Sequence, residues 1–294
     1  MPTLRQNLVA LMMHQYPLYS GCGTVANTPL VRKLAGDGEG LHWARLRCGR
    51  ELLVPIDDYV GRAAFYSGDL DRKVSWVCRR LVRPGDTVLD IGANLGLVTM
   101  LLSSLVGPEG RVHAFEPNPR MVELLQQSID RNYAANVTVH PVALGTEEAE
   151  LDLHVPVNHA GQASLRSNAR GTRVRVPVKQ LAAIPSLPLD RPIRLVKIDV
   201  EGYEPEVLRG AAPLLSRNPP HTILFELNRH ETFASHPTVQ ILAAHGYDFL
   251  ALPKRWLRMR ATPVNGATHL PGHDFVAIHK GENHRWMRAA LGAV

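Results

Sequence analysis

A short turn between a buried strand and an apolar helix carries the clearest chemical signal in the sequence. Residues 88–100 read Val-Leu-Asp-Ile-Gly-Ala-Asn-Leu-Gly-Leu-Val-Thr-Met. Gly92 and Gly96 let the backbone turn sharply and approach a ligand closely, because a Cβ atom at either position would collide with the turn or the bound molecule. Asp90 lies where the strand ends. The pattern therefore predicts a ligand-binding loop at this end of the strand.

An acidic residue at the end of the next strand indicates what the loop binds. The apolar run 112–115 ends in Glu116, twenty residues after Gly96, where a carboxylate accepts hydrogen bonds from the two hydroxyls of a ribose. A dinucleotide-binding loop would have a glycine in place of Asn94, to make room for a diphosphate. The asparagine side chain suits S-adenosylmethionine, which has an amino-acid part instead. Asp90 would then face the ammonium group of this cofactor.

A second acidic cluster follows another buried strand. Residues 195–204 read Leu-Val-Lys-Ile-Asp-Val-Glu-Gly-Tyr-Glu, and such a cluster of carboxylates is costly unless it binds a cation, a proton or hydroxyl groups. Glu204 also fits a simpler role as the cap of the following helix. Asp199 and Glu201 should lie beside the cofactor, since their strand is expected to adjoin the first one. Glu226 ends the next strand and adds a fourth acidic group to the same rim.

These acidic groups predict a reaction for the cofactor. Methyl transfer to an oxygen needs an aligned acceptor and the removal of the hydroxyl proton as the new bond forms. A buried carboxylate with a raised pKa, or a histidine, can be that base. Asp199 and Glu201 are therefore the expected catalytic residues, with His159 a weaker third. The sequence has no tight spacing of metal ligands, so no metal is predicted.

The elements that position these residues alternate between strand and helix from residue 87 onward. This alternation predicts a mostly parallel sheet with helices on both faces. Strands are expected at 87–92, 111–116, 137–144, 194–200, 222–227, 247–252 and 274–280. Helices are expected at 96–106, 119–132, 204–217 and 237–245, with one more at 70–82 before the first strand.

The chain before this alternation is expected to form an N-terminal extension over residues 1–68. Residues 2–14 fit a short amphipathic helix, and 18–40 look like an irregular connection. Residues 42–48 and 51–57 alternate between apolar and polar, which predicts a β-hairpin. We expect this extension to contact the substrate or a second copy of the chain in a homo-oligomer.

Residues 69–282 are expected to form the cofactor-binding domain, and 283–294 a C-terminal tail. Within the domain, the stretch 145–185 departs from the alternation, because 151–157 and 173–178 alternate as strands around a polar loop. An insertion at this place could cover the carboxyl ends of the core strands, where ligands of open α/β sheets bind. We therefore expect the insertion to contact the small-molecule substrate.

Composition sets broad limits on the function. The 294 residues are 45% hydrophobic, enough for one large core. The three cysteines are an odd number at unrelated spacings, so neither a disulfide framework nor a zinc cluster is expected. The net charge is +6, but the basic residues are scattered apart from modest clusters at 254–260 and 285–288, so no nucleic-acid partner is expected. No apolar run approaches the ~20 residues of a membrane span, and a cytoplasmic protein without a membrane partner is expected.

One motif points to a different kind of acceptor. Asn218-Pro219-Pro220-His221 is similar to the Asn-Pro-Pro-aromatic motif with which amino-group methyltransferases hold a planar nitrogen. Here the motif precedes the fifth strand instead of following the fourth, and a histidine takes the place of the aromatic residue. We interpret it as a helix stop.

Four segments of the chain resemble the FkbM-type S-adenosylmethionine-dependent methyltransferase family. They are 88–96, 114–119, 142–145 and 196–211, and the last, which contains Asp-Val-Glu-Gly-Tyr-Glu, is the most specific. The segment Gly-Gln-Ala-Ser-Leu at 161–165 is also similar to a Ser-Leu segment of the family. The resemblance covers about residues 60–230.

The resemblance implies the class I methyltransferase fold, a Rossmann-like α/β fold whose seven-stranded, mostly parallel sheet has an antiparallel last strand. It also implies O-methylation of small-molecule hydroxyls, such as those of polyketides, other secondary metabolites and sugars. Asp199 and Glu201 match the active-site strand of the family. By match of motif, the cofactor-binding residues are Asp90, Gly92, Asn94 and Gly96 for the methionine part, Glu116 for the ribose and Ala143 for the adenine edge.

Two other functions are open at this point. A nicotinamide-dependent oxidoreductase would also use a strand-turn-helix unit and Glu116, although Asn94 and the lack of a three-glycine fingerprint argue against it. A non-catalytic RNA-binding module that kept the fold is suggested only by the positive net charge, since phosphate contacts need basic residues.

Overall fold

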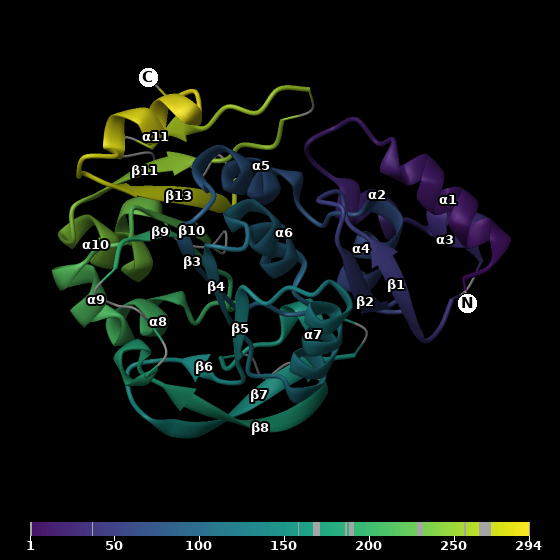
Figure 1. Cartoon of the computed structure of the whole chain (residues 1–294), viewed down its shortest axis with the longest axis horizontal. Helices are drawn as coiled ribbons and strands as arrows, with labels where there is room; N and C mark the ends of the chain where they lie inside the picture. The colour runs from purple at the N-terminus through teal and green to yellow at the C-terminus, as the bar shows by residue number, and fades with distance from the viewer. Residues whose placement is uncertain are drawn as a thin grey trace.

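A large central sheet organises the molecule (Figure 1). The computed structural model describes residues 2–36, 38–157, 159–166, 171–185, 187, 191–227, 232–255, 257–264 and 272–293. The strands of the large sheet are β3 (Thr87–Ile91), β4 (Arg111–Phe115), β5 (Val137–His140), β9 (Ile193–Ile198), β10 (Thr222–Glu226), β11 (Tyr247–Ala251), β12 (Thr262–Pro263) and β13 (Asp274–His279).

The order across the sheet is β12-β11-β13-β10-β9-β3-β4-β5. Neighbouring strands from β10 to β5 are parallel, and β13 is antiparallel to both of its neighbours, β10 and β11. All seven predicted strands are present, and the antiparallel last strand is confirmed. The two-residue β12 adds a short eighth strand at the edge.

Helices cover both faces of this sheet. The strands are apolar on both faces, as is usual for parallel sheets. Val88, Val112 and Leu195 pack on one side, in a cluster with α5 (Arg72–Leu81), α6 (Leu97–Val106) and α11 (His284–Ala290). Leu89 and Val196 face the other side, towards α8 (Glu204–Gly210), α9 (Ala212–Arg217) and α10 (Pro237–Ala244). The carboxyl ends of the central strands therefore remain open between two layers of helices.

The predicted helix over 204–217 is two helices. Pro213 has no N–H to continue the ladder of hydrogen bonds, so the chain breaks there. Ala211 closes the first helix, its N–H donating to the carbonyl of Val207 at 3.0 Å. The second helix, α9, ends at Arg217, directly before Asn218, which confirms the interpretation of the Asn-Pro-Pro-His motif as a helix stop.

The N-terminal part holds more helix than expected. It consists of α1 (Leu4–His14), α2 (Cys22–Ala26), α3 (Pro29–Ala35), the hairpin β1 (Leu41–Arg45) and β2 (Glu51–Pro55), and α4 (Tyr59–Ser67). The irregular connection predicted for 18–40 is wrong, because it contains α2 and α3. Thr28 caps α3 by accepting from the N–H of Val31 at 3.4 Å, ahead of a proline in the first turn. The predicted hairpin is confirmed.

The hairpin is joined to α7 (Pro119–Arg131), a helix beside the sheet. The N–H of Leu53 donates to Ser128 Oγ at 3.0 Å, and the N–H of Glu51 donates to Asn132 Oδ1 at 2.9 Å. Apolar side chains of the hairpin, α4, α6 and α7 form one buried cluster. The N-terminal part is thereby held against α6 and α7.

The insertion forms a small separate sheet. Its strands are β6 (Ala143–Leu144), β7 (Ala149–Pro156) and β8 (Gly171–Lys179), and β8 lies between the other two. The strand predicted over 137–144 is therefore wrong in its second half, which leaves the large sheet after His140. Pro141 follows and cannot donate to a strand ladder. Positions 158 and 167–170 of the predicted polar loop lie outside the described residues.

The remaining elements are short. Three 3₁₀ turns lie at Ala160–Gln162, Leu181–Ala183 and Phe233–Ser235. None of the helices in the described part of the chain combines the length and the apolar character needed to cross a membrane.

Candidate active site

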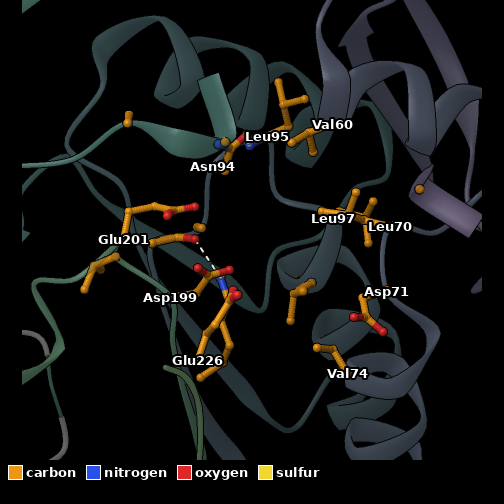
Figure 2. Close-up of a pocket in the computed structure, with 18 of the residues that line it drawn as sticks. Val60, Leu70, Asp71, Val74, Asn94, Leu95, Leu97, Asp199, Glu201 and Glu226 are labelled. Carbon is orange, nitrogen blue, oxygen red and sulfur yellow. Dashed lines mark hydrogen bonds and ion pairs between the residues drawn. The ribbon is translucent and has the colours of Figure 1, made fainter. Parts of the chain in front are cut away.

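A cavity of about 720 Å³ opens at the carboxyl ends of β3, β4, β9 and β10. Its wall also includes the segment between α1 and α2 and part of the insertion. Figure 2 shows Asp199, Glu201 and Glu226 on one side of the cavity and apolar side chains such as Leu70 and Leu97 on the other. This size and mixed lining are typical of small-molecule sites.

Gly92 and Gly96 shape the loop between β3 and α6 through their contacts with neighbouring elements. Gly92 has a φ of 78°, and a Cβ atom there would lie 1.9 Å from the carbonyl oxygen of Asp199. Gly96 has a φ of 92°, and its Cβ atom would lie 2.3 Å from Leu125 Cδ1 on α7. Both positions require glycine. The loop therefore lies directly against β9 and α7, as a sharp turn of the predicted kind.

Asn94 and Glu116 are joined across this loop. The backbone N–H of Asn94 donates to Glu116 Oε2 at 2.7 Å, and that of Asn118 donates to Oε1 at 2.8 Å. Burial raises the pKa of Glu116 to about 7, although these two amides oppose the shift. Glu116 lines the cavity, and the second lone pair of each oxygen can accept from a ribose hydroxyl. Its position suits the predicted ribose contact.

The side chain of Asn94 closes its own turn. Its Oδ1 accepts from the N–H of Leu95 at 2.6 Å, and its φ of 51° is unusual for a residue with a Cβ atom. Asparagine is among the few residues that adopt this conformation readily. A glycine here would lose this hydrogen bond, so the asparagine has a structural reason as well as the predicted ligand contact.

Asp90 lies behind the cavity wall. Its side chain is fully buried, and the Thr99 hydroxyl donates to its Oδ2 at 2.6 Å. Its Oδ1 lies 3.4 Å from Lys197 Nζ, as an ion pair without hydrogen-bond geometry. Asp90 does not line the cavity. The prediction that its carboxylate faces the ammonium group of the cofactor is therefore not supported by its position.

Lys197 is a site residue that the sequence analysis missed. Its Nζ donates to the carbonyl oxygen of Gly92 at 2.7 Å and lies 3.4 Å from Asp199 Oδ2, besides its contact with Asp90. Burial alone would lower the pKa of Lys197, but Asp199 and Asp90 outweigh it and raise the pKa. A lysine that follows the apolar pair Leu195-Val196 inside a strand, two residues before an aspartate, was the signal that could have revealed it.

Three acidic side chains at the ends of β9 and β10 form an acidic rim of the cavity, namely Asp199, Glu201 and Glu226. Burial, with the nearby charges of Asp199 and Glu204, raises the pKa of Glu201 to about 7. Burial and several neighbouring carboxylates, Asp199 first among them, raise the pKa of Glu226 to about 8. Asp199 differs from both because it is paired with Lys197. The rim thus combines a paired carboxylate with two groups that titrate near neutral pH.

Glu201 is held in a strained conformation. Its φ is 51°, which costs a residue with a Cβ atom about 1–2 kcal/mol. Its carbonyl oxygen accepts from the Ser164 hydroxyl at 2.8 Å. Glu204 Oε1 accepts from the N–H groups of Val200 and Gly202 on either side, both at 3.2 Å. The prediction that Glu204 caps the following helix is wrong, because the N-cap of α8 is Tyr203, which makes no side-chain capping bond. Glu204 instead supports the loop that presents Glu201 to the cavity.

The two remaining predicted residues also line the cavity. His159 stacks on Tyr59 with ring centroids 4.6 Å apart, and its buried Nδ1 has no hydrogen-bond partner among the described residues. Ala143, on β6, lines the cavity beside Val142 and Leu144, as expected for a contact with a flat adenine edge. The structure thus brings eight of the nine predicted residues to the cavity, or to the loop that forms its wall, and sets only Asp90 behind it.

A second charged group at the cavity was also missed. Lys73 Nζ pairs with Asp71 at 3.2 Å and with Asp274, and all three residues line the cavity. Asp69 lines it too and is buried, with no hydrogen-bond partner for its Oδ1 in the described structure. Asp69 and Asp71 lie before α5, Lys73 in its first turn and Asp274 at the start of β13, so isolated charged residues gave no signal of a common site. Among the described residues, no group of three or more His, Cys, Asp or Glu side chains is arranged to hold a metal ion.

The strand order, the antiparallel β13 and the glycine loop after β3, at a cavity lined by the carboxylate of Glu116, define a class I S-adenosylmethionine-dependent methyltransferase. The description "Methyltransferase FkbM domain" belongs to a family model that matches residues 90–249, more than half of the chain. The chain belongs to this family.

Its curated relatives are similar over part of their length. Methyltransferase 1 of Beauveria bassiana is 29% identical over 43% of this chain and 59% of its own. Hexuronic acid methyltransferase AglP of Haloferax volcanii is 30% identical over 42% of this chain and 49% of its own. The chain thus spans about three-fifths and one-half of these relatives. The crystal structure of methyltransferase FkbM from Methylobacillus flagellatus has a TM-score of 0.41 and 17% identity, covering 74% of this chain and 54% of that one.

The cavity fits the cofactor of this family. Glu116 offers acceptor oxygens for ribose hydroxyls, and the absence of side chains at Gly92 and Gly96 keeps the loop close to Asp199 and to α7. Carboxylates of the acidic rim, Asp199 first among them, offer negative charge near a sulfonium or an ammonium group. Residues 92–96 of the loop carry no charged side chain, so a bound S-adenosylmethionine would not bury an unpaired charge of this loop.

Proposed function

We propose that the protein transfers a methyl group from S-adenosylmethionine to a hydroxyl of a small molecule, such as a sugar or a polyketide-type secondary metabolite. The observation that carries this proposal is Glu201, a cavity-lining carboxyl group with a pKa of about 7 on a strained backbone. A hydroxyl must lose its proton as it is methylated, and a base whose pKa lies near the working pH serves this best. Strain of this kind gathers at functional sites.

The cofactor loop has a holding role in this proposal. S-adenosylmethionine, when bound, supplies an electrophilic methyl group. The loop from Gly92 to Gly96 would hold its methionine part, Glu116 its ribose and Ala143 its adenine edge. Asp90 acts through Lys197, whose Nζ binds the carbonyl of Gly92 and fixes the loop. Asp90 is thus a positioning residue in this proposal.

The acidic rim has the chemical role. Glu201, deprotonated above pH 7, accepts the hydroxyl proton. Glu226, with a pKa of about 8, still carries its proton at pH 7 and can donate a hydrogen bond to the acceptor. Asp199 stays negative beside Lys197 and orients the hydroxyl group. His159 is the second choice of base, since its buried Nδ1 has no partner among the described residues.

The acceptor would enter past the N-terminal part and the insertion. Tyr16, Leu18 and Ser20 from the N-terminal part and Leu153 and Leu165 from the insertion line the cavity. This supports the division into an extension at 1–68 that contacts substrate, a methyltransferase domain at 69–282 and a tail at 283–294. The mixed apolar and hydroxyl lining suits a neutral, partly apolar acceptor.

Neither alternative function is retained. The hypothesis of a nicotinamide-dependent oxidoreductase is dropped because the chain belongs to a methyltransferase family. An RNA-binding role is disfavoured because the cavity is rimmed by carboxylates, which repel phosphate. The expectation that nucleic acid is not a partner therefore stands as part of this proposal.

A matched pair of acceptors tests the proposal. The protein would be incubated with isotopically labelled S-adenosylmethionine and with sugars and polyketide alcohols, each paired with the amine that replaces its hydroxyl. Mass spectrometry should find a methyl ether from the alcohols. Methylation of the amines alone, or calorimetry that shows no binding of S-adenosylhomocysteine, would overturn the proposal. Asp199→Asn should abolish turnover and keep cofactor affinity within about tenfold, because the rim acts mainly in the transition state.

A further inference from the structure

Exposed apolar side chains gather on the two outermost N-terminal helices. On α1 and α3, six large apolar residues are each more than half exposed: Leu4, Leu8, Leu11, Met12, Leu30 and Leu34. Their spacing of three, four and eight residues places them on one face of each helix. Because α1 packs against α3 and both lie at one end of the molecule (Figure 1), the six side chains are exposed on adjoining helices, and we name them together the α1–α3 surface.

This surface is not the packed side of α1. Val9, Ala10 and Met13, on the other side of the helix, pack against the buried cluster of the hairpin, α4 and α7. The helix is therefore apolar on two sides, of which only one is covered. Exposed apolar patches of this kind mark interaction sites, so we expect the uncovered side of α1 to contact a partner.

The charges around the α1–α3 surface indicate which occupant it has. Arg5, Arg32 and Lys33 are exposed on the same two helices. Residues 1–36 contain no aspartate or glutamate, although the whole chain has 27 acidic residues. The first acidic residues, Asp37 and Glu39, come after α3. The exposed charged residues of α1 and α3 are therefore all positive, and two apolar helices with only positive charge are complementary to an anionic lipid headgroup layer.

A second copy of the chain fits this surface less well. In a symmetric dimer the same patch meets itself, so Arg5, Arg32 and Lys33 would face their equivalents without a counter-charge. Like charges at an interface disfavour association.

We propose that the α1–α3 surface docks on a membrane that contains anionic phospholipid. The apolar side chains enter the headgroup boundary, and Arg5, Arg32 and Lys33 contact the phosphates. The segment that follows α1 lines the cavity at Tyr16 and Leu18, so docking brings one wall of the cavity close to the lipid. This proposal replaces the expectation of no membrane partner and is independent of the acceptor proposed above.

Vesicle sedimentation with the full chain tests this docking. Two vesicle types would be compared, phosphatidylcholine alone and phosphatidylcholine with phosphatidylglycerol. We expect co-sedimentation with the anionic vesicles and a steep loss as salt rises. Failure to sediment with the anionic vesicles, or equal binding to both types, would overturn the proposal.

Two matched leucine variants distinguish vesicle binding through this surface from nonspecific binding of the protein. Leu4 and Leu257 are each 76% exposed, so either substitution by glutamine should leave the fold intact, as thermal unfolding would check. Leu4→Gln should weaken vesicle binding about tenfold, because it removes apolar surface from the lipid boundary, and Leu257→Gln should leave it unchanged. Equal losses in both variants would contradict the assignment.

A charge pair and a mass measurement complete the test. Arg32→Gln with Lys33→Gln should weaken binding to anionic vesicles about fivefold per charge, equivalent to about 1 kcal/mol each, whereas the exposed pair Arg217→Gln with Arg285→Gln should not. Sedimentation velocity should find a monomer. A dimer that Leu4→Gln dissociates would show that a second copy covers the surface and would overturn the proposal.

Discussion

Two loops at neighbouring strand ends share a backbone feature and use it differently. The loop after β3 contains Asn94 and the loop after β9 contains Glu201, and both residues have a φ of 51°. The side chain of Asn94 closes its own turn by accepting from the N–H of Leu95. The side chain of Glu201 points into the cavity (Figure 2), while Ser164 and Glu204 hold its backbone from outside.

This difference matches the two roles that we propose, namely cofactor binding for the loop after β3 and proton transfer for the loop after β9. In the first loop the Asn94 side chain is used within the turn, so the loop offers its backbone and its shape to a ligand. In the second loop other residues hold the backbone, and burial, with the charges of Asp199 and Glu204, raises the pKa of Glu201 to about 7. The same strain of about 1–2 kcal/mol thus supports binding after β3 and, in the function proposed here, chemistry after β9.

Breaking the contact between the two loops should have the largest effect. Gly92→Ala would place a Cβ atom 1.9 Å from the carbonyl oxygen of Asp199, so one loop must move away from the other. We expect a loss of about 4 kcal/mol or more in the free energy of unfolding and no measurable cofactor binding. Denaturant titration and calorimetry measure the two effects.

Gly85→Ala is the matched control. Gly85 has a φ of 85°, but a Cβ atom there meets nothing within 4 Å. It should cost only the strain of the left-handed conformation, about 1 kcal/mol, with normal cofactor affinity. Similar losses at positions 85 and 92 would mean that the contact between the loops is unimportant.

Removing the carboxylate of the second loop should affect turnover and spare binding. Glu201→Gln should lower kcat by at least about a hundredfold and change cofactor affinity by less than about threefold. In the wild type, kcat should rise as pH increases through about 7, because burial, Asp199 and Glu204 raise the pKa of Glu201 against the opposing effect of Lys197. Glu123→Gln, an exposed change on α7, is the control. An unchanged pH profile in Glu201→Gln would remove it from the role of base.

The fold was largely predictable because apolar periodicity reports burial directly. The seven strands were located as apolar runs between helices, and the hairpin from its alternation of apolar and polar residues. The errors came where one residue overrides periodicity: Pro213 splits a helix, Pro141 ends a strand, and Thr28 with Pro29 starts a helix in a segment that looked irregular. Local backbone chemistry decided each of these.

The site was predictable where its residues share one strand end, and not where distant segments meet. Asp199, Glu201 and Glu116 lie directly after apolar runs. Lys73 and Asp274 meet only because β13 inserts beside β10, a pairing that spacing along the chain does not encode. Asp90 was assigned to the ligand because the sequence shows that a residue ends a strand but not which way its side chain faces.

A substitution at Glu226 should change the pH dependence of the free energy of unfolding. The folded-state pKa of Glu226 is raised to about 8 from an ordinary value of 4.5, first by burial and then by neighbouring carboxylates. Its contribution to stability is therefore fully present below about pH 4.5 and is lost as pH rises through about 8. Glu226→Gln should raise the free energy of unfolding at pH 8 by at least about 1 kcal/mol and change it little at pH 4.5. A stabilisation of equal size at both pH values would contradict this pKa.

The smallest effect is expected from the support of the second loop. Ser164→Ala removes the hydroxyl that donates to the Glu201 carbonyl, a bond worth about 1 kcal/mol. We expect kcat to fall about fivefold with KM unchanged. Ser216→Ala, on the exposed side of α9, should leave both constants at the wild-type value, and a wild-type kcat in Ser164→Ala would show that the loop needs no clamp.

The contact between Gly92 and Asp199 has a consequence for engineering and for divergence within the family. The two loops share a backbone contact and the hydrogen bond from Lys197, so each loop is shaped to fit the other. In a chimera that takes the loop after β9 from a relative and keeps the native loop after β3, this contact would no longer fit. Specificity should therefore transfer only when residues 90–96 and 197–204 are moved together.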